Sequence, residues 1–378
     1  MAGFAGRELE EPSRQPGVAP ATVSVLRRKR SWLMAAAAVV VVIVVALAIV
    51  VTTSGSPGSP SGRLKLVDRL VLPQSFSLFG AAVSPDGSTV YVTGDSDSGP
   101  PGGLYAIDVA TGQVRTVAEG VGNLAVSLAV SPDGRLAYVT DHYGDALTPV
   151  DLAGGRDLPR IAVGMQPASV AIAGHGSTAY TVSDSGHTVV PVNLAARRAG
   201  PAITIAGPAP RSGKLPGLGL HASIAVSPDG GTVYVTVPDR GVVVPIDVAT
   251  SKAGRPLAAG RSPRGIAITP DGKVAYVTNA NCCTTNGVAA INLSTGRLSR
   301  PVNHIDLAFL GPIAIAPNGQ LAYVGGGDVN LTAIDLTTNE PLNPLRIAPD
   351  ALSIALTRAG TRAYIVTERE VDVVQLSR

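Results

Sequence analysis

One four-residue turn recurs along most of the chain, and this repeat constrains the fold more than any other feature of the sequence. Five copies read Ser, Thr or Ala, then Pro, then Asp or Asn, then Gly, and two copies are degenerate. Proline fixes φ at the second position, the acid or amide caps the turn, and glycine takes the position with φ > 0. Each copy therefore predicts a β-hairpin. The seven copies begin at Ser84, Ser131, Ala173, Ser227, Thr269, Ala316 and Thr357.

A strand centred on tyrosine follows every turn. These positions take seven of the nine tyrosines of a chain that is only 4% aromatic: Tyr91, Tyr138, Tyr180, Tyr234, Tyr276, Tyr323 and Tyr364. We expect them to be structural and to fill the space between neighbouring sheets. In six copies a third strand follows that ends in an apolar residue and Asp or Asn, as in Ile107-Asp108. This acid or amide is expected to cap the next turn.

The spacing of the copies predicts the architecture. The repeat covers residues 64–378, and four strands in about 40–45 residues are typical of a propeller blade. The last copy ends with its third strand, so a strand over about 64–72 is expected to supply its fourth and to close the ring, which removes two exposed edges. The predicted fold is all-β, a seven-bladed β-propeller of four-stranded antiparallel blades.

Recurring motifs such as Ala137-Tyr138-Val139-Thr140 and Val233-Tyr234-Val235-Thr236, together with the turns, resemble the YVTN family of β-propeller repeats. The resemblance covers about the whole of residues 64–378. It implies a protein of the bacterial cell envelope, and it extends to propellers with lactonase activity. The chain departs from the pattern at Ala173-Gly174-His175-Gly176 and Thr357-Arg358-Ala359-Gly360, where we expect less regular packing.

The N-terminal segment predicts a membrane anchor. Trp32–Val51 is a run of twenty residues without a charge, which matches a transmembrane helix over 32–52. The basic run Arg27–Arg30 places residues 1–31, a disordered tail, in the cytoplasm. A flexible linker over 53–63 then leads to an extracytoplasmic propeller. The alternative is a cleaved signal peptide, with Ala46-Leu47-Ala48 as the cleavage site.

Charge argues against a nucleic-acid partner. The net charge is +3, but the basic excess lies in residues 1–53, and the rest of the chain carries equal numbers of acidic and basic residues. A nucleic-acid binder would carry its positive charge on the folded domain.

Candidate site residues lie on the face that carries the loops between second and third strands and between blades, because extra loops on one face often carry function. They are Asp95, Asp97, Asp141, His142, Tyr143, Asp145, Asp184, His187, His221, Asp239, Arg240, Arg264, Asp328 and Glu368. Asp141 and His142 could bind a divalent metal or transfer protons, or belong to a solvated loop. His221 precedes the inner strand of blade four and either faces the channel or caps that strand.

The two cysteines, Cys282 and Cys283, are adjacent in a long loop of blade five. Outside the membrane they are expected to form a vicinal disulfide, with an interchain bond or a reduced pair as alternatives. Without a nearby histidine they make no zinc site. Asp95-Ser96-Asp97 lacks the later glutamate of a calcium loop and is interpreted as a turn.

Two functional hypotheses follow. The first is a membrane-tethered binding module at the cell envelope, with a protein or glycan partner; the sequence contains no phosphate loop, nucleophile elbow or zinc-protease motif. The second is a lactonase-like hydrolase or lyase, in which Asp141, His142 and His221, with or without a divalent metal, act at the channel mouth. Convergence of the histidines and acids on the channel would distinguish the two.

Overall fold

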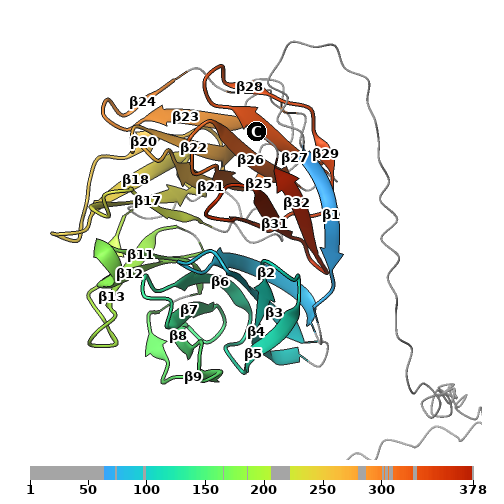
Figure 1. Ribbon diagram of the computed structural model, residues 1–378. Helices are drawn as coiled ribbons and strands as arrows, with labels where there is room; N and C mark the ends of the chain where they lie inside the picture. Colours follow the sequence, from blue (N-terminus) through green and yellow to red (C-terminus); the bar gives the residue numbers. More distant parts are fainter. Residues whose placement is uncertain are drawn as a thin grey trace, which may run out of the picture. The chain divides into compact units, whose positions relative to one another are not determined.

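The computed structural model describes residues 64–72, 75–96, 99–164, 166–184, 186–205, 222–279, 287–299, 302, 305, 310–326 and 330–376. These residues form seven antiparallel sheets that follow one another along the chain (Figure 1). The described residues include no helix long and apolar enough to cross a bilayer. The predicted tail, transmembrane helix and linker lie outside them.

The first strands of the blades line the centre of a closed ring, because each contacts the first strand of the blade before and after it, and β30 contacts β2. These strands are β2 (Ser75–Val83), β6 (Ala125–Val130), β11 (Pro167–Ala173), β16 (Ile224–Val226), β21 (Pro263–Ile268), β25 (Leu310–Ile315) and β30 (Ser353–Leu356). The prediction of a seven-bladed propeller is confirmed.

The second and third strands complete the inner part of each sheet. The second strands are β3 (Thr89–Ser96), β7 (Leu136–Asp141), β12 (Thr178–Ser183), β17 (Thr232–Val237), β22 (Val274–Asn279), β26 (Leu321–Gly326) and β31 (Arg362–Val366). The third strands are β4 (Gly99–Asp108), β8 (Ala146–Asp151), β13 (Thr188–Asn193), β18 (Val242–Asp247), β23 (Val288–Asn292), β27 (Asn330–Asp335) and β32 (Val371–Leu376). The turns from first to second strand define the turn face, and the connections from second to third strand define the loop face.

The outer strands are short, and in four blades two separate segments pair with the third strand. They are β5 (Val114–Glu119), β9 (Arg156–Asp157) with β10 (Ile161–Ala162), β14 (Arg198–Ala199) with β15 (Ile203–Thr204), β19 (Lys252–Ala253) with β20 (Leu257–Ala258), β24 (Arg297–Leu298), β28 (Glu340–Pro341) with β29 (Leu345–Arg346), and β1 (Leu64–Leu70). Two single-turn 3₁₀ helices, η1 (Gly174–Gly176) and η2 (Pro238–Arg240), complete the elements.

The N-terminal strand β1 closes the ring as the sequence predicts. It pairs antiparallel with β32, from Leu64 opposite Leu376 to Leu70 opposite Val371. Beside this pairing, Arg69 Nε lies 3.0 Å from a carboxylate oxygen of the buried Asp372. Because β32 ends at the turn face, β1 begins there, so the chain enters the propeller from that face.

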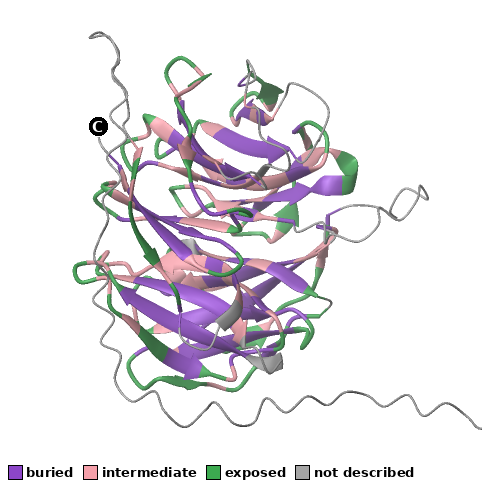
Figure 2. Cartoon of the chain, turned by 90° about the vertical axis from the view of Figure 1, so that its right-hand side faces the viewer, coloured by how far each residue is buried: buried purple, intermediate pink, exposed green. Residues whose placement is uncertain are grey.

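A buried apolar cluster lies at each of the seven seams between neighbouring sheets, and the repeated tyrosine belongs to it (Figure 2). Every one of these tyrosines pairs with an alanine of the first strand, as Tyr180 does with Ala171. The small alanine leaves room for the ring beside the next blade. The Tyr180 hydroxyl donates to the carbonyl of Val248 in blade four at 3.3 Å. The prediction that the tyrosines fill the seams is confirmed.

The threonine two residues after the tyrosine makes hydrogen bonds where the pairing of the first and second strands is interrupted. In blade five the register of β21 with β22 shifts between Pro263 and Ile266. There Thr278 Oγ1 accepts a hydrogen bond from the Gly265 amide at 2.9 Å and donates to the Gly311 carbonyl of blade six at 2.7 Å. One hydroxyl thus replaces a missing ladder contact and bridges two blades.

The acids of the turn face cap their own turns. Asp86 accepts hydrogen bonds from the Ser84 hydroxyl and from the amide and hydroxyl of Ser88. These donors lower the pKa of Asp86 to about 2, the Ser84 hydroxyl most. Asp108, at the end of β4, accepts from the amides of Ala110 and Thr111, as predicted.

Candidate functional site

The loop face carries the candidate residues, and the first group surrounds Asp141 at the end of β7. This carboxylate is fully buried. One oxygen accepts from the amides of Asn123, at 2.7 Å, and Gly144, at 2.9 Å. The other accepts from Arg160 Nη1 at 2.9 Å, and Arg160 also reaches the Gly120 carbonyl. Asp141 therefore organises the loop and the connection from blade one.

Backbone hydrogen bonds hold His142 and Tyr143, which follow Asp141, against the connection from blade one. The amides of His142 and Tyr143 donate to the carbonyls of Leu124 and Asn123, both at 3.1 Å. The His142 ring is buried and meets the Tyr143 ring edge to face, with centroids 5.0 Å apart. Tyr143 is 62% exposed. The loop thus presents one aromatic side chain to solvent from a fixed backbone.

Blades three and four meet through a histidine and a carboxylate. His187 Nε2 lies 2.9 and 3.0 Å from the two carboxylate oxygens of Asp239, which belongs to η2. The backbone makes this approach possible at Gly186, whose φ is +75° and where a β-carbon would lie 2.6 Å from the Thr236 carbonyl oxygen. Imidazole beside carboxylate is an arrangement suited to proton transfer.

Arg264 and Asp184 are two further charged residues of the loop face. Arg264 lies at the loop-face end of β21, on the inner strand of blade five, and Asp184 directly follows β12 of blade three. Burial lowers the pKa of the Arg264 guanidinium, and the charge of Asp184 opposes that shift. The two opposite charges, from blades three and five, therefore attract each other.

Asp95 is half-buried near the end of β3. Burial raises the pKa of its carboxyl group most, and the negative charge of Asp141 raises it further. A hydrogen bond from the Ala125 amide acts in the opposite direction. Asp95 is thus a carboxyl group whose ionisation the surroundings oppose.

Of the other predicted site residues, three are described, and they lie apart on the loop face. Asp145 accepts from the Gln166 amide at 2.7 Å, which ties the loop to blade three. Arg240 ends η2, and Glu368 is exposed after β31. Asp97, His221, Cys282, Cys283 and Asp328 lie outside the described residues. In the part of the chain that is described, no three His, Cys, Asp or Glu residues form a group that could hold a metal ion.

Sequence reasoning missed the partners that give these acids their roles. Arg160 belongs to a short outer segment between β9 and β10, nineteen positions from Asp141 in the chain. Asp372 of the closing pair stands where no other blade carries an acid. This departure from the repeat could have indicated the partners of Asp372, because a lone acid on a buried strand requires a cation or amide donors.

No family model matches this sequence, and no curated protein does. Among solved structures, one described as Kuenenia stuttgartiensis hydrazine synthase superposes with a TM-score of 0.66 and 21% sequence identity. The match covers 81% of this chain and 97% of that one. At this identity the likeness establishes the propeller fold alone.

Proposed function

We propose that this chain is a membrane-tethered, extracytoplasmic β-propeller that binds a protein or glycan of the bacterial cell envelope on its loop face. The uncharged run Trp32–Val51 and the preceding Arg27–Arg30 support a single-pass anchor in the cell membrane with the N-terminus in the cytoplasm. The resemblance of the repeats to the YVTN family supports the envelope location. No nucleic-acid partner is proposed.

The exposed Tyr143 on its fixed loop carries the proposal. Tyrosines that are exposed in the free protein and anchor an interface often supply much of its binding energy. A side chain on a rigid backbone loses little conformational entropy on binding, which favours affinity. Asp141, Arg160 and two backbone amides supply that rigidity here.

The direction of the chain adds a second argument. Leu64 begins β1 at the turn face, so Tyr143 lies on the opposite face. A propeller tethered through Leu64 would present the Tyr143 loop away from the anchor.

Site-specific photocrosslinking tests this proposal. A photoreactive phenylalanine replaces Tyr143 in the full chain in cells, and the same residue replaces the exposed turn-face Arg135 as a matched control. We expect one defined envelope adduct from position 143 and none from position 135. Equal adducts from both positions, or none from position 143, would contradict a loop-face binding site.

The alternative, a lactonase-like hydrolase or lyase, is favoured by one specific observation, the His187–Asp239 pair at 2.9 Å. A carboxylate that orients an imidazole supports general acid–base catalysis. Hydrolysis of simple lactones is measured with and without divalent metal ions. Activity that His187→Ala abolishes would support the enzyme, and activity that survives this substitution would exclude this pair as its centre.

A further inference from the structure

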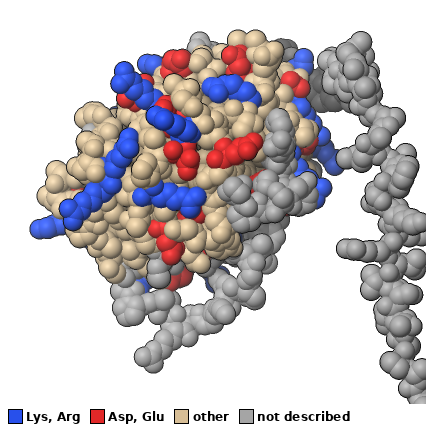
Figure 3. All heavy atoms as spheres, turned by 90° about the horizontal axis from the view of Figure 1, so that it is seen from below, with Lys and Arg blue, Asp and Glu red and all other residues tan. Residues whose placement is uncertain are grey.

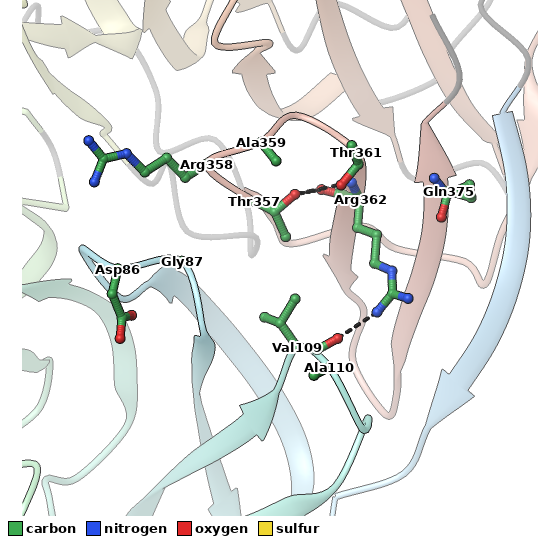
Figure 4. A pocket seen from close by; sticks show the side chains of 10 residues that line it. All are labelled: Asp86, Gly87, Val109, Ala110, Thr357, Arg358, Ala359, Thr361, Arg362 and Gln375. Carbon is green, nitrogen blue, oxygen red and sulfur yellow. Dashed lines mark hydrogen bonds between the residues drawn. The ribbon is translucent and has the colours of Figure 1, made fainter.

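A groove of about 700 Å³ crosses the turn face where blade seven meets blade one (Figure 4). Its lining comes from two turns of blade one and from the turn and third strand of blade seven. The lining includes Asp86, Val109, Arg358, Ala359, Arg362 and Gln375. This volume is in the range of small-molecule sites in proteins.

The groove arises where the turn sequence of blade seven departs from the repeat. At five of the other six seams the turn proline packs against the turn glycine of the next blade, as Pro85 does against Gly134, whereas blade three has Gly174 in the proline position. In blade seven Arg358 stands in the proline position, and its β-carbon lies against Gly87. Its Nη1 donates to the Pro85 carbonyl at 3.0 Å. The departure that predicted irregular packing instead places a cation at this seam.

A second arginine lies at the other end of the groove. Arg362 Nη1 donates to the Val109 carbonyl at 2.5 Å. Figure 4 shows the Arg358 and Arg362 side chains directed to opposite ends. Each guanidinium carries five N–H donors. In each arginine, the hydrogen bond to a backbone carbonyl fixes the guanidinium, and the other N–H groups can donate to a ligand.

The charge of the lining favours an anion. Relative to the regular turn, Arg358 adds one positive charge and Ala359 removes one negative charge. Asp86 is the acid in the lining, and the hydroxyls of Ser84 and Ser88 and the Ser88 amide already bind its carboxylate. On the face that Figure 3 shows, basic and acidic side chains are interspersed.

Strand β1 begins beside this groove. Lys65 pairs with Gln375, which lines the groove, and Leu64 pairs with Leu376. The predicted linker over 53–63 is short, so a chain anchored by residues 32–52 would hold the turn face near the bilayer surface. Lys65 is exposed there and adds a third cation.

We infer that this groove binds the phosphate of an anionic phospholipid headgroup and so seats the turn face on the membrane. The inference rests on the proposed membrane anchor. Arginine is suited to phosphate because its planar donors match the phosphate oxygens.

Vesicle binding tests the inference with the fragment 55–378, which contains the seven buried clusters and the strand that closes the ring. We measure cosedimentation with vesicles of phosphatidylglycerol and phosphatidylcholine and with phosphatidylcholine alone. We expect binding to the anionic vesicles, and an approximately tenfold weaker partition for Arg358→Ala, since a hydrogen bond to a charged group contributes about 1.5 kcal/mol. Arg135→Ala, on the same face outside the groove, removes only diffuse attraction to the surface and should weaken the partition clearly less.

Three results would overturn it. Equal binding to both kinds of vesicle would show that the anionic headgroup is not recognised. An equal loss of vesicle binding in Arg135→Ala and Arg358→Ala would indicate diffuse electrostatic attraction. Protection of the fragment against thermal unfolding by inorganic phosphate, lost in Arg358→Ala while vesicles give no binding, would identify a free phosphate as the ligand. Arg358→Lys, which keeps the charge, controls for folding.

The fragment lacks residues 1–54, so its vesicle binding does not depend on the anchor. Alkaline extraction of membranes that contain the full chain tests the anchor separately. A chain that stays in the membrane, with a fragment that ignores anionic vesicles, would refute the groove and leave the proposed function intact.

Discussion

Aspartate side chains on the two faces of this propeller differ in their hydrogen-bond partners and in their burial. On the turn face Asp86 and Asp108 bind partners within three positions in the chain, and both are exposed. On the loop face Asp141 binds Asn123 and Arg160, eighteen and nineteen positions away, and is fully buried. A repeated sequence can encode contacts within a turn in every blade. Contacts between residues far apart in the chain require particular pairs, which occur in single blades and make those blades different from the others.

The first prediction breaks the loop-face network. Asp141→Ala leaves the amides of Asn123 and Gly144 without their acceptor and Arg160 without its partner. We expect a loss of about 3 kcal/mol in the free energy of unfolding, at the lower end for a buried ion pair because Arg160 is half-exposed. Urea unfolding measures it. The matched turn-face variant Asp133→Ala should cost much less, and an equal cost would contradict the contrast between the faces.

The second prediction concerns the threonine that joins two blades. Thr278→Val keeps the shape of the side chain but leaves the Gly265 amide and the Gly311 carbonyl without their partner. We expect a loss of about 1–2 kcal/mol in unfolding free energy, typical of a buried backbone group left unsatisfied. The control Thr250→Val removes a contact within one exposed turn. A larger loss for Thr250→Val would refute the bridging role.

The fold was predictable because its repeat is local, and the site was less so because its contacts are not. The turns, the seven tyrosines and the closing strand follow from spacing and alternation. The Asp141–Arg160 contact joins the end of β7 to an outer segment of the same blade, and the His187–Asp239 contact joins blades three and four. No local pattern marks such pairs.

The blade-seven turn is a case in which the sequence marked the position but did not predict the contact made there. Its sequence, Thr357-Arg358-Ala359-Gly360, was visible as a departure from the repeat. Whether a departure loosens a seam or gives it a new contact depends on what lies opposite. Here Pro85 and Val109 supply carbonyl acceptors for the two arginines, which only the three-dimensional structure reveals.

The third prediction uses acid to test the caps of the turn face. Hydrogen bonds hold the pKa of Asp86 at about 2, below the ordinary 3.8, and donors of their own turns also lower the pKa of Asp133, Asp229 and Asp271. Their contribution to stability is therefore complete above about pH 4 and is lost as the pH falls through the lower folded values. Unfolding free energies measured from pH 5 to pH 2 should decrease. Constant stability over this window would contradict the role of the caps.

The fourth and smallest prediction has the opposite sign. Burial raises the pKa of Asp95, so its ionisation destabilises the fold at pH 7, and the cost disappears below its unfolded pKa. Asp95→Asn should raise the melting temperature slightly at pH 7, with no gain at pH 3. A decrease at pH 7 would mean that the hydrogen bond from the Ala125 amide outweighs the cost of burying the carboxylate.

We propose that the propeller turns its turn face to the membrane and its loop face to a partner. Single cysteines at positions 135, on the turn face, and 143, on the loop face, are labelled with a donor dye in the full chain, with Cys282 and Cys283 changed to serine. Energy transfer to an acceptor lipid in reconstituted vesicles reports the height of each position above the bilayer. The account predicts stronger transfer from position 135, and equal transfer or stronger transfer from position 143 would contradict it.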